Sequence, residues 1–287
     1  MKRVGVGMLS LLLLLVCSVP MSAASSDAVQ VDEAVLDQYL LDQGAPADWV
    51  NRLNIDLKKL YYNEKAKFIT VEKVTGTLVE TALLNSESED QLDTLDLDNF
   101  TAYISVVQLP SPTPGLNEFS FSYHWDWDYR PTFTLTDKFG MAWTDGFDLV
   151  NDSAFLYYTV RGYRPVGETP CTLELISDQT LDRYDPGLGV GWAFDIVSSV
   201  NDGSQLGACI VHEHSGFGHA TVVIDHDNDN SIESSSLVGT YFHKFIGANG
   251  ELTFSSNPSI SISPSYNYDR AQDVPKQFNW YHQDYNP

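Results

Sequence analysis

From Phe68 to the C-terminus, apolar and polar residues alternate in short runs. Typical runs are TAYISVVQL, SAFLYYTVRGY and HATVVID, and clusters of Gly, Pro, Asn or Asp separate them. Alternation with period two indicates strands that bury one face, and regularly spaced turn signals are typical of antiparallel sandwiches. We therefore expect residues 67–287 to form an antiparallel β-sandwich, or a barrel-like sandwich.

Before this region the apolar spacing changes to that of helices. In VDEAVLDQYLLDQG, Val35, Leu36, Tyr39 and Leu40 share one helical face, and Gly44 fits a helix C-terminus. A second helix is expected after this glycine, with Pro46 early in it, and IDLKKLYYNEKAKF predicts a third. Residues 25–66 are therefore expected to form a short helical N-terminal segment in front of the sandwich.

Part of this helical segment carries a family resemblance. The stretch LDQYLLDQGAPADWVNRLNIDLKKLYY, residues 36–62, resembles the N-terminal segment of uncharacterised secreted proteins of Firmicutes. In those proteins, too, a short amphipathic helix is followed by a Gly-x-Pro break and a Leu/Lys/Tyr segment. The resemblance implies an exported protein of a Gram-positive cell, and it implies no catalytic activity.

The first 24 residues have the order of a secretory signal peptide. Lys2 and Arg3 precede the apolar run MLSLLLLLVC, and the small residues SAA come directly before Ser25. No later segment offers the ~20 uninterrupted apolar residues of a membrane-spanning helix. We expect cleavage after residue 24, secretion to the cell envelope or the extracellular space, and no transmembrane segment in the mature chain.

The charge of the mature chain narrows the classes of partner. The whole chain has 16 Lys and Arg against 39 Asp and Glu. Removal of Lys2 and Arg3 with the signal peptide leaves 14 against 39, a net charge of −25. Nucleic acids and anionic membranes would be repelled, because phosphate binding depends on clustered Lys and Arg. Nucleic-acid binding is therefore the function that the sequence favours least, and we expect no nucleic-acid partner.

Outside the signal peptide the only cysteines are Cys171 and Cys209. An even count in an oxidising compartment favours a disulfide over two buried free thiols. Closing this loop would stabilise the fold by roughly 4 kcal/mol on the chain-entropy model.

The stretch FSFSYHWDWDYR, residues 119–130, places an aromatic ring at every odd position. The rings belong to Phe119, Phe121, Tyr123, Trp125, Trp127 and Tyr129. Each ring buries ~150–250 Å², so an exposed row would be a very large apolar patch. We expect most of the rings to lie in the core, with a ligand-stacking platform at Trp125 and Trp127 as the alternative. The even positions, including His124, Asp126 and Asp128, are expected to face solvent, where they could hold a cation.

The Asp-rich segment DHDNDNSIESSS, residues 225–236, resembles the first half of a calcium loop. Its predicted ligands are Asp225, Asp227, Asp229, Ser231 and Glu233, and Asn230 can take the left-handed conformation that such a loop needs at its sixth position. Ser236 replaces the bidentate Glu of the twelfth position, so only weak Ca²⁺ binding is expected. The alternative is a polar hairpin turn.

A histidine-rich segment precedes this loop. CIVHEHSGFGHATVVID is interpreted as two strands around a Ser-Gly-Phe-Gly turn, which would place His212, His214 and His219 on one face. Three imidazoles on one face could bind a transition metal, and the alternative is a structural or solvent-facing cluster.

The sequence contains no Gly-x-Ser-x-Gly elbow, and neither cysteine lies in a recognisable reactive context. We therefore favour a non-enzymatic exported protein that binds a glycan or a protein, without excluding an enzyme. One alternative is a secreted metal-dependent hydrolase that uses the three histidines. Another is a surface-adhesion or membrane-inserting protein, suggested by the alternating segment SISISPSYNYD.

Overall fold

The computed structural model describes residues 31–76, 78–79, 100–128, 134–178 and 181–287. The expected signal peptide and Tyr129 lie outside these ranges. The chain divides into two compact units, Met1–Asp32 and Glu33–Pro287, and everything below concerns the second unit.

Three short helices open this unit, as the sequence predicts. They are α1 (Glu33–Asp42), α2 (Ala47–Val50) and α3 (Ile55–Asn63). Gly44 follows the end of α1 with a φ of 86°, a left-handed conformation that favours glycine. The side chain of Asn54 accepts a hydrogen bond from the backbone N–H of Asp56 at 2.7 Å and so caps the start of α3. In the part of the chain that the structure describes, no helix combines the length and apolar character that crossing a membrane requires.

The remainder is antiparallel β-structure, which confirms the predicted fold class. An eight-stranded sheet has the order β1-β3-β4-β12-β7-β8, with β6 and β11 also paired to β12. Its strands are β1 (Lys67–Thr75), β3 (Phe100–Leu109), β4 (Leu116–Trp127), β6 (Asp148–Leu149), β7 (Phe155–Arg164), β8 (Thr169–Asp178), β11 (Ser199–Val200) and β12 (Cys209–Asp225).

A seven-stranded sheet has the order β2-β16-β13-β5-β10-β9, and β17 also pairs with β13. Its strands are β2 (Leu78–Val79), β5 (Thr136–Trp143), β9 (Arg183–Asp185), β10 (Gly189–Asp195), β13 (Ile232–Lys244), β16 (Tyr268–Ala271) and β17 (Val274–Tyr281). A separate hairpin is formed by β14 (Glu251–Ser255) and β15 (Ser259–Ser263), and two 3₁₀ turns are η2 (Val166–Glu168) and η3 (Ser265–Asn267).

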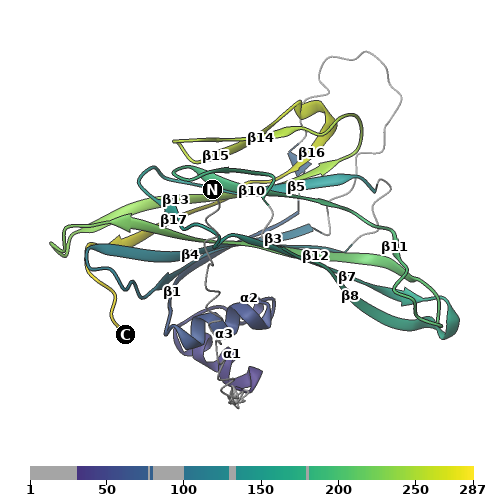
Figure 1. Cartoon of the computed structure of the whole chain (residues 1–287), viewed down its shortest axis with the longest axis horizontal. Coiled ribbons are helices and arrows are strands. Elements are labelled where there is room, and N and C mark those ends of the chain that lie inside the picture. The colour runs from purple at the N-terminus through teal and green to yellow at the C-terminus, as the bar shows by residue number, and fades with distance from the viewer. Residues whose placement is uncertain (1–30, 77, 80–99, 129–133, 179–180) are drawn as a thin grey trace, which may run out of the picture. The chain divides into compact units, whose positions relative to one another are not determined.

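These elements stack in four layers (Figure 1). The main core lies between the two large sheets, a second apolar cluster joins the helices to the outer face of the eight-stranded sheet, and a third joins the β14–β15 hairpin to the seven-stranded sheet. Ile260 and Ile262 of the hairpin belong to the third cluster. The isoleucines of SISISPSYNYD, whose alternation suggested a membrane-inserting strand, therefore pack against the seven-stranded sheet of the same chain.

The aromatic residues of β4 form the centre of the main core. Phe119, Phe121, Tyr123, Trp125 and Trp127 are each 0–1% exposed and contact rings of both sheets. The prediction that most of the odd-numbered rings are buried is confirmed. The platform alternative is corrected, because burial leaves neither indole face of Trp125 or Trp127 open for a ligand to stack on.

The other face of β4 departs from the expectation of a solvated surface. Ser120, Ser122 and His124 are buried, because the helical segment packs over them. The hydroxyl of Tyr61 on α3 lies 2.8 Å from that of Ser120, and His124 Nε2 lies 3.2 Å from the Ser122 hydroxyl. Toward the two ends of this face, Glu118, Asp126 and Asp128 reach solvent. Period-two patterning predicts the two faces of β4 correctly, but it cannot show that the polar face is covered.

The predicted His hairpin is wrong, because β12 runs without a turn from Cys209 to Asp225. Its glycines make room for aromatic rings of the core. A Cβ atom on Gly216 would lie 2.8 Å from Trp125, and one on Gly218 would lie 2.4 Å from Trp192. Neither glycine has a positive φ. The Ser-Gly-Phe-Gly segment is therefore part of a strand, and its core-facing residues are glycines because side chains there would collide with these rings.

We expect Gly218→Ala to lower the free energy of unfolding by about 1–3 kcal/mol, because the added methyl group overpacks a rigid core. Both nearest contacts, Trp192 and Phe139, are buried rings that have little room to move. Urea unfolding monitored by circular dichroism measures the change. Gly187→Ala is the matched control, since the nearest atom to its new methyl group is 4.0 Å away. Equal stability of the two variants would contradict this explanation of the glycines.

The predicted disulfide between Cys171 and Cys209 is confirmed. It joins the first strand-forming residues of β8 to the start of β12, across a sequence separation of 38 residues.

Candidate functional site

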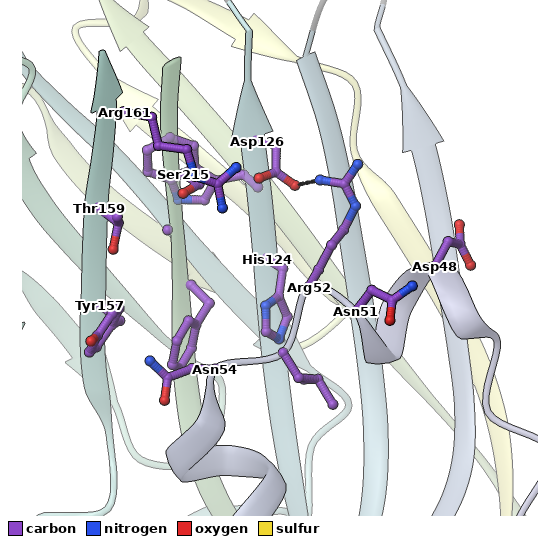
Figure 2. Close-up of a pocket in the computed structure, with 14 residues that line it drawn as sticks. Asp48, Asn51, Arg52, Asn54, His124, Asp126, Tyr157, Thr159, Arg161 and Ser215 are labelled. Carbon is purple, nitrogen blue, oxygen red and sulfur yellow. Dashed lines mark hydrogen bonds and ion pairs between the residues drawn. The ribbon is translucent and has the colours of Figure 1, made fainter. Parts of the chain in front are cut away.

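A cleft of about 540 Å³ opens between the helical segment and the outer face of the eight-stranded sheet. Its volume lies in the range of small-molecule binding sites. One wall is formed by α2 and the α2–α3 connection, and the sheet contributes residues of β4, β12 and β7 (Figure 2). The lining residues are Asp48, Asn51, Arg52, Leu53, Asn54, His124, Trp125, Asp126, Tyr157, Thr159, Arg161, Ser215, Gly216 and Phe217.

Three rings form a ladder across the sheet beneath this cleft. His124 on β4, Phe217 on β12 and Tyr157 on β7 are directly opposite one another in the strand register. The rings of His124 and Phe217 stack with centroids 5.0 Å apart, and those of Phe217 and Tyr157 stack at 5.4 Å. Tyr157 is the half-buried member, and its hydroxyl donates a hydrogen bond to Glu174. The ladder gives the cleft a rigid, partly aromatic floor.

The rim of the cleft carries charged and amide groups. Arg52 extends from the helical segment to an ion pair with Asp126 on β4, as Figure 2 shows. Arg161 on β7 is exposed, and its guanidinium lies 3.7 Å from Glu213. Asn51 is exposed and Asn54 is half-buried. These planar groups present several donors and acceptors toward one space.

Both acidic residues of the cleft have cationic partners. The side chain of Lys73 hydrogen-bonds Asp48 at 3.1 Å and lowers the pKa of that carboxyl, and Tyr103 adds a hydrogen bond at 3.2 Å. Asp126 is paired with Arg52. A general acid needs a raised pKa, so this arrangement suits ligand binding better than acid catalysis.

The predicted tryptophan pair does not form the site. Trp125 contributes to the floor of the cleft but is 1% exposed, and Trp127 is not among the lining residues. No sequence motif marks Asn51, Arg52 or Arg161 as site residues, because the two segments that carry them are far apart in the chain.

The three histidines of the predicted metal face are separated. His214 is buried on the core side, where its Nδ1 lies 2.8 Å from the Tyr158 hydroxyl. His219 is buried beside Ser153, whose carbonyl oxygen lies 3.3 Å from its Nδ1. His212 is 48% exposed near Glu213. Because β12 is one continuous strand, residues 214 and 219 project from opposite faces, and the expected shared metal face does not exist.

The Asp-rich loop gathers a different set of side chains from the one predicted. Among the described residues, the structure brings Asp227 and Asp229 together with His282, which follows β17. Asp225 is not a member of this group, and the backbone N–H of Ser231 donates a hydrogen bond to Asp229 Oδ1 at 2.7 Å. His282 Nε2 also lies 3.1 Å from Glu233, and hydrogen bonds with Asp227 and Glu233 raise the pKa of His282. Asn230 has the expected left-handed φ of 61°.

No protein-family model matches this chain, and no curated protein sequence matches it. Several solved structures are distantly similar. A structure described as a pore forming protein is 10% identical, with 76% of this chain and 97% of that chain covered and a TM-score of 0.34. The membrane-inserted form of the Clostridium perfringens NetB toxin is also 10% identical, with the same coverage and a TM-score of 0.32.

The keratin-10-binding (KRT10) region domain of the pneumococcal serine rich repeat protein PsrP is 11% identical, with 74% of this chain and 98% of that chain covered and a TM-score of 0.28. Likenesses this distant assign no function to the chain.

Proposed function

We propose that this chain is an exported binding protein that takes an uncharged carbohydrate, part of a glycan, into the cleft between the helical segment and the eight-stranded sheet. Export is supported by the signal-like order of residues 1–24 and by the Cys171–Cys209 disulfide, which requires an oxidising compartment.

The observation that carries the proposal is the composition of the cleft surface. Its exposed side chains are polar and planar, and its floor is the ring ladder of His124, Phe217 and Tyr157. Neighbouring hydroxyls of a sugar ring match the paired donors and acceptors of Arg, Asn and Asp side chains. The apolar face of a sugar ring matches an aromatic surface such as that of Tyr157.

The charge of the cleft supports the choice of a neutral ligand. Two Arg and two Asp residues line it, so its formal charge is zero. The chain as a whole carries −23, which repels anionic ligands at long range. An uncharged sugar is not repelled by the negative chain, and it needs no net charge in the cleft to bind.

Binding of purified protein to a panel of soluble neutral oligosaccharides, followed by calorimetric titration of the best ligand, tests the proposal. Arg161→Ala should weaken binding about 10- to 100-fold, the effect of losing hydrogen bonds from a charged group. Arg183→Ala is the matched control, because Arg183 is a similarly exposed arginine paired with Glu251 and lies outside the cleft. Equal affinities of the two variants, or no binding to any sugar of the panel, would refute the proposal.

A further inference from the structure

A second group of side chains shares no residue with the cleft. We call Asp227, Asp229, Glu233 and His282 the His282 cluster. Asp227 and Asp229 lie in the connection from β12 to β13, Glu233 is at the start of β13, and His282 follows β17. We propose that the His282 cluster binds a divalent first-row transition-metal ion such as Zn²⁺, through His282 Nδ1 and one carboxylate oxygen each of Asp227 and Asp229.

The distances between the three ligand atoms fit a shared ion. His282 Nδ1 lies 3.2 Å from Asp227 Oδ1 and 3.7 Å from Asp229 Oδ1. All three ligand atoms are within 4.8 Å of one another. Bonds of ~2.0–2.2 Å to one Zn²⁺ place tetrahedral ligand atoms roughly 3.3–3.6 Å apart. Small side-chain rotations therefore suffice to form the site.

The imidazole is already oriented as a ligand. Glu233 lies 3.1 Å from His282 Nε2, and Asp227 Oδ1 lies 3.2 Å from Nδ1. With Nε2 donating to Glu233, a metal ion would take the place of the proton between Nδ1 and the two aspartates. The ring stacks on Trp280, with centroids 4.7 Å apart and planes at 16°. The backbone N–H of His282 donates to the carbonyl of Ser231 at 2.9 Å. Ring stacking and backbone pairing are independent of the acidic side chains, and they hold the nitrogen in place.

The nitrogen ligand decides the class of ion. Calcium takes oxygen ligands, whereas imidazole suits zinc and its neighbours in the first transition row. Neither residues 225–236 nor residues 281–287 contain a Lys or Arg that could neutralise the carboxylates. The calcium loop expected from the sequence is therefore replaced here by a mixed nitrogen and oxygen site, with its remaining coordination positions open to water.

Such an ion would have a structural consequence. The β12–β13 connection is one of the connections by which the chain passes from the eight-stranded to the seven-stranded sheet. His282 belongs to the tail after β17. A bound metal ion would link the β12–β13 connection to the C-terminal tail. Because the ion would bind only the native state, it would raise the stability of the folded protein.

Calorimetric titration of tag-free protein with Zn²⁺, and melting curves with and without Zn²⁺, test the inference. We expect one equivalent to bind and the melting temperature to rise by a few degrees. His282→Gln should abolish both effects, and Glu233→Gln should weaken binding about 10- to 100-fold, the usual effect of losing the carboxylate that orients a metal-bound histidine. Co²⁺ should give a visible absorption band in the wild type that His282→Gln lacks.

His212→Gln is the matched control, because His212 is an exposed histidine beside a carboxylate elsewhere on β12. This variant should bind Zn²⁺ like the wild type. Undiminished Zn²⁺ binding by a folded His282→Gln variant would overturn the inference. So would an equal rise in melting temperature with Ca²⁺ that survives His282→Gln, which would restore the oxygen-only calcium loop.

Discussion

Trp125→Ala is expected to lower the free energy of unfolding by about 3–5 kcal/mol, as for other large-to-small changes of a buried aromatic residue. The indole of Trp125 stacks on Phe194 with centroids 5.2 Å apart, and it lies 5.0 Å from the ring of Tyr241. Both partner rings belong to the seven-stranded sheet, so truncation would leave a cavity where the two sheets meet. Urea unfolding at neutral pH measures the loss.

Tyr184→Ala is the control for this prediction, because Tyr184 is 58% exposed and should contribute little to stability. The same experiment separates the two interpretations of the aromatic strand. A small loss of stability together with abolished ligand binding would show that Trp125 belongs to a binding platform and not to the core.

Acid is expected to destabilise the protein well before its carboxylates become protonated. Burial lowers the pKa of His124 to about 3 and the pKa values of His214 and His219 to about 4. In the unfolded chain these imidazoles titrate near 6.5, so between the two values the unfolded state binds more protons than the folded state. Stability is therefore full above about pH 6.5 and is lost as the pH falls. The loss at pH 5 is about 2 kcal/mol for each imidazole.

Urea unfolding between pH 7.5 and pH 5 tests this dependence. His124→Asn removes one titrating group and should reduce the slope of stability against pH by about 1.4 kcal/mol per pH unit below pH 6. The raised pKa of His282 acts in the opposite direction, but this residue is at the surface and contributes less. Stability that stays constant or increases toward pH 5 would contradict the burial of these three imidazoles in the neutral form.

The sequence patterns predict those features that depend on local periodicity. Alternation from Phe68 onward predicts the strands and the burial of the rings of β4, and the 3.6-residue spacing predicts the helices. The Cys171–Cys209 pairing follows from cysteine count and compartment. Each of these sequence patterns is contained within one helix or strand, or within one pair of cysteines, so it can be recognised without knowing how the elements pack.

The predictions that were wrong or incomplete have a common physical cause. Each concerns a feature that depends on which other element packs against a strand, and the local pattern does not contain this information. Gly216 and Gly218 indicate a turn by themselves, and only the positions of Trp125 and Trp192 show why a strand needs them. Ser122 and His124 are buried by helices that pack on the outer face of β4, and the alternation within a strand does not predict where these helices pack. Arg52 and Arg161 meet at one cleft although more than a hundred residues separate them in the sequence. Asp227 and His282 likewise meet in the His282 cluster from different parts of the chain.

A crystal structure of the protein with the oligosaccharide that binds most tightly tests the central claim most directly. The proposed function predicts sugar density in the cleft, with hydroxyls in contact with Arg161 and the Arg52–Asp126 pair and one sugar face toward Tyr157. Sugar density on another surface, with the cleft filled only by solvent, would contradict the claim.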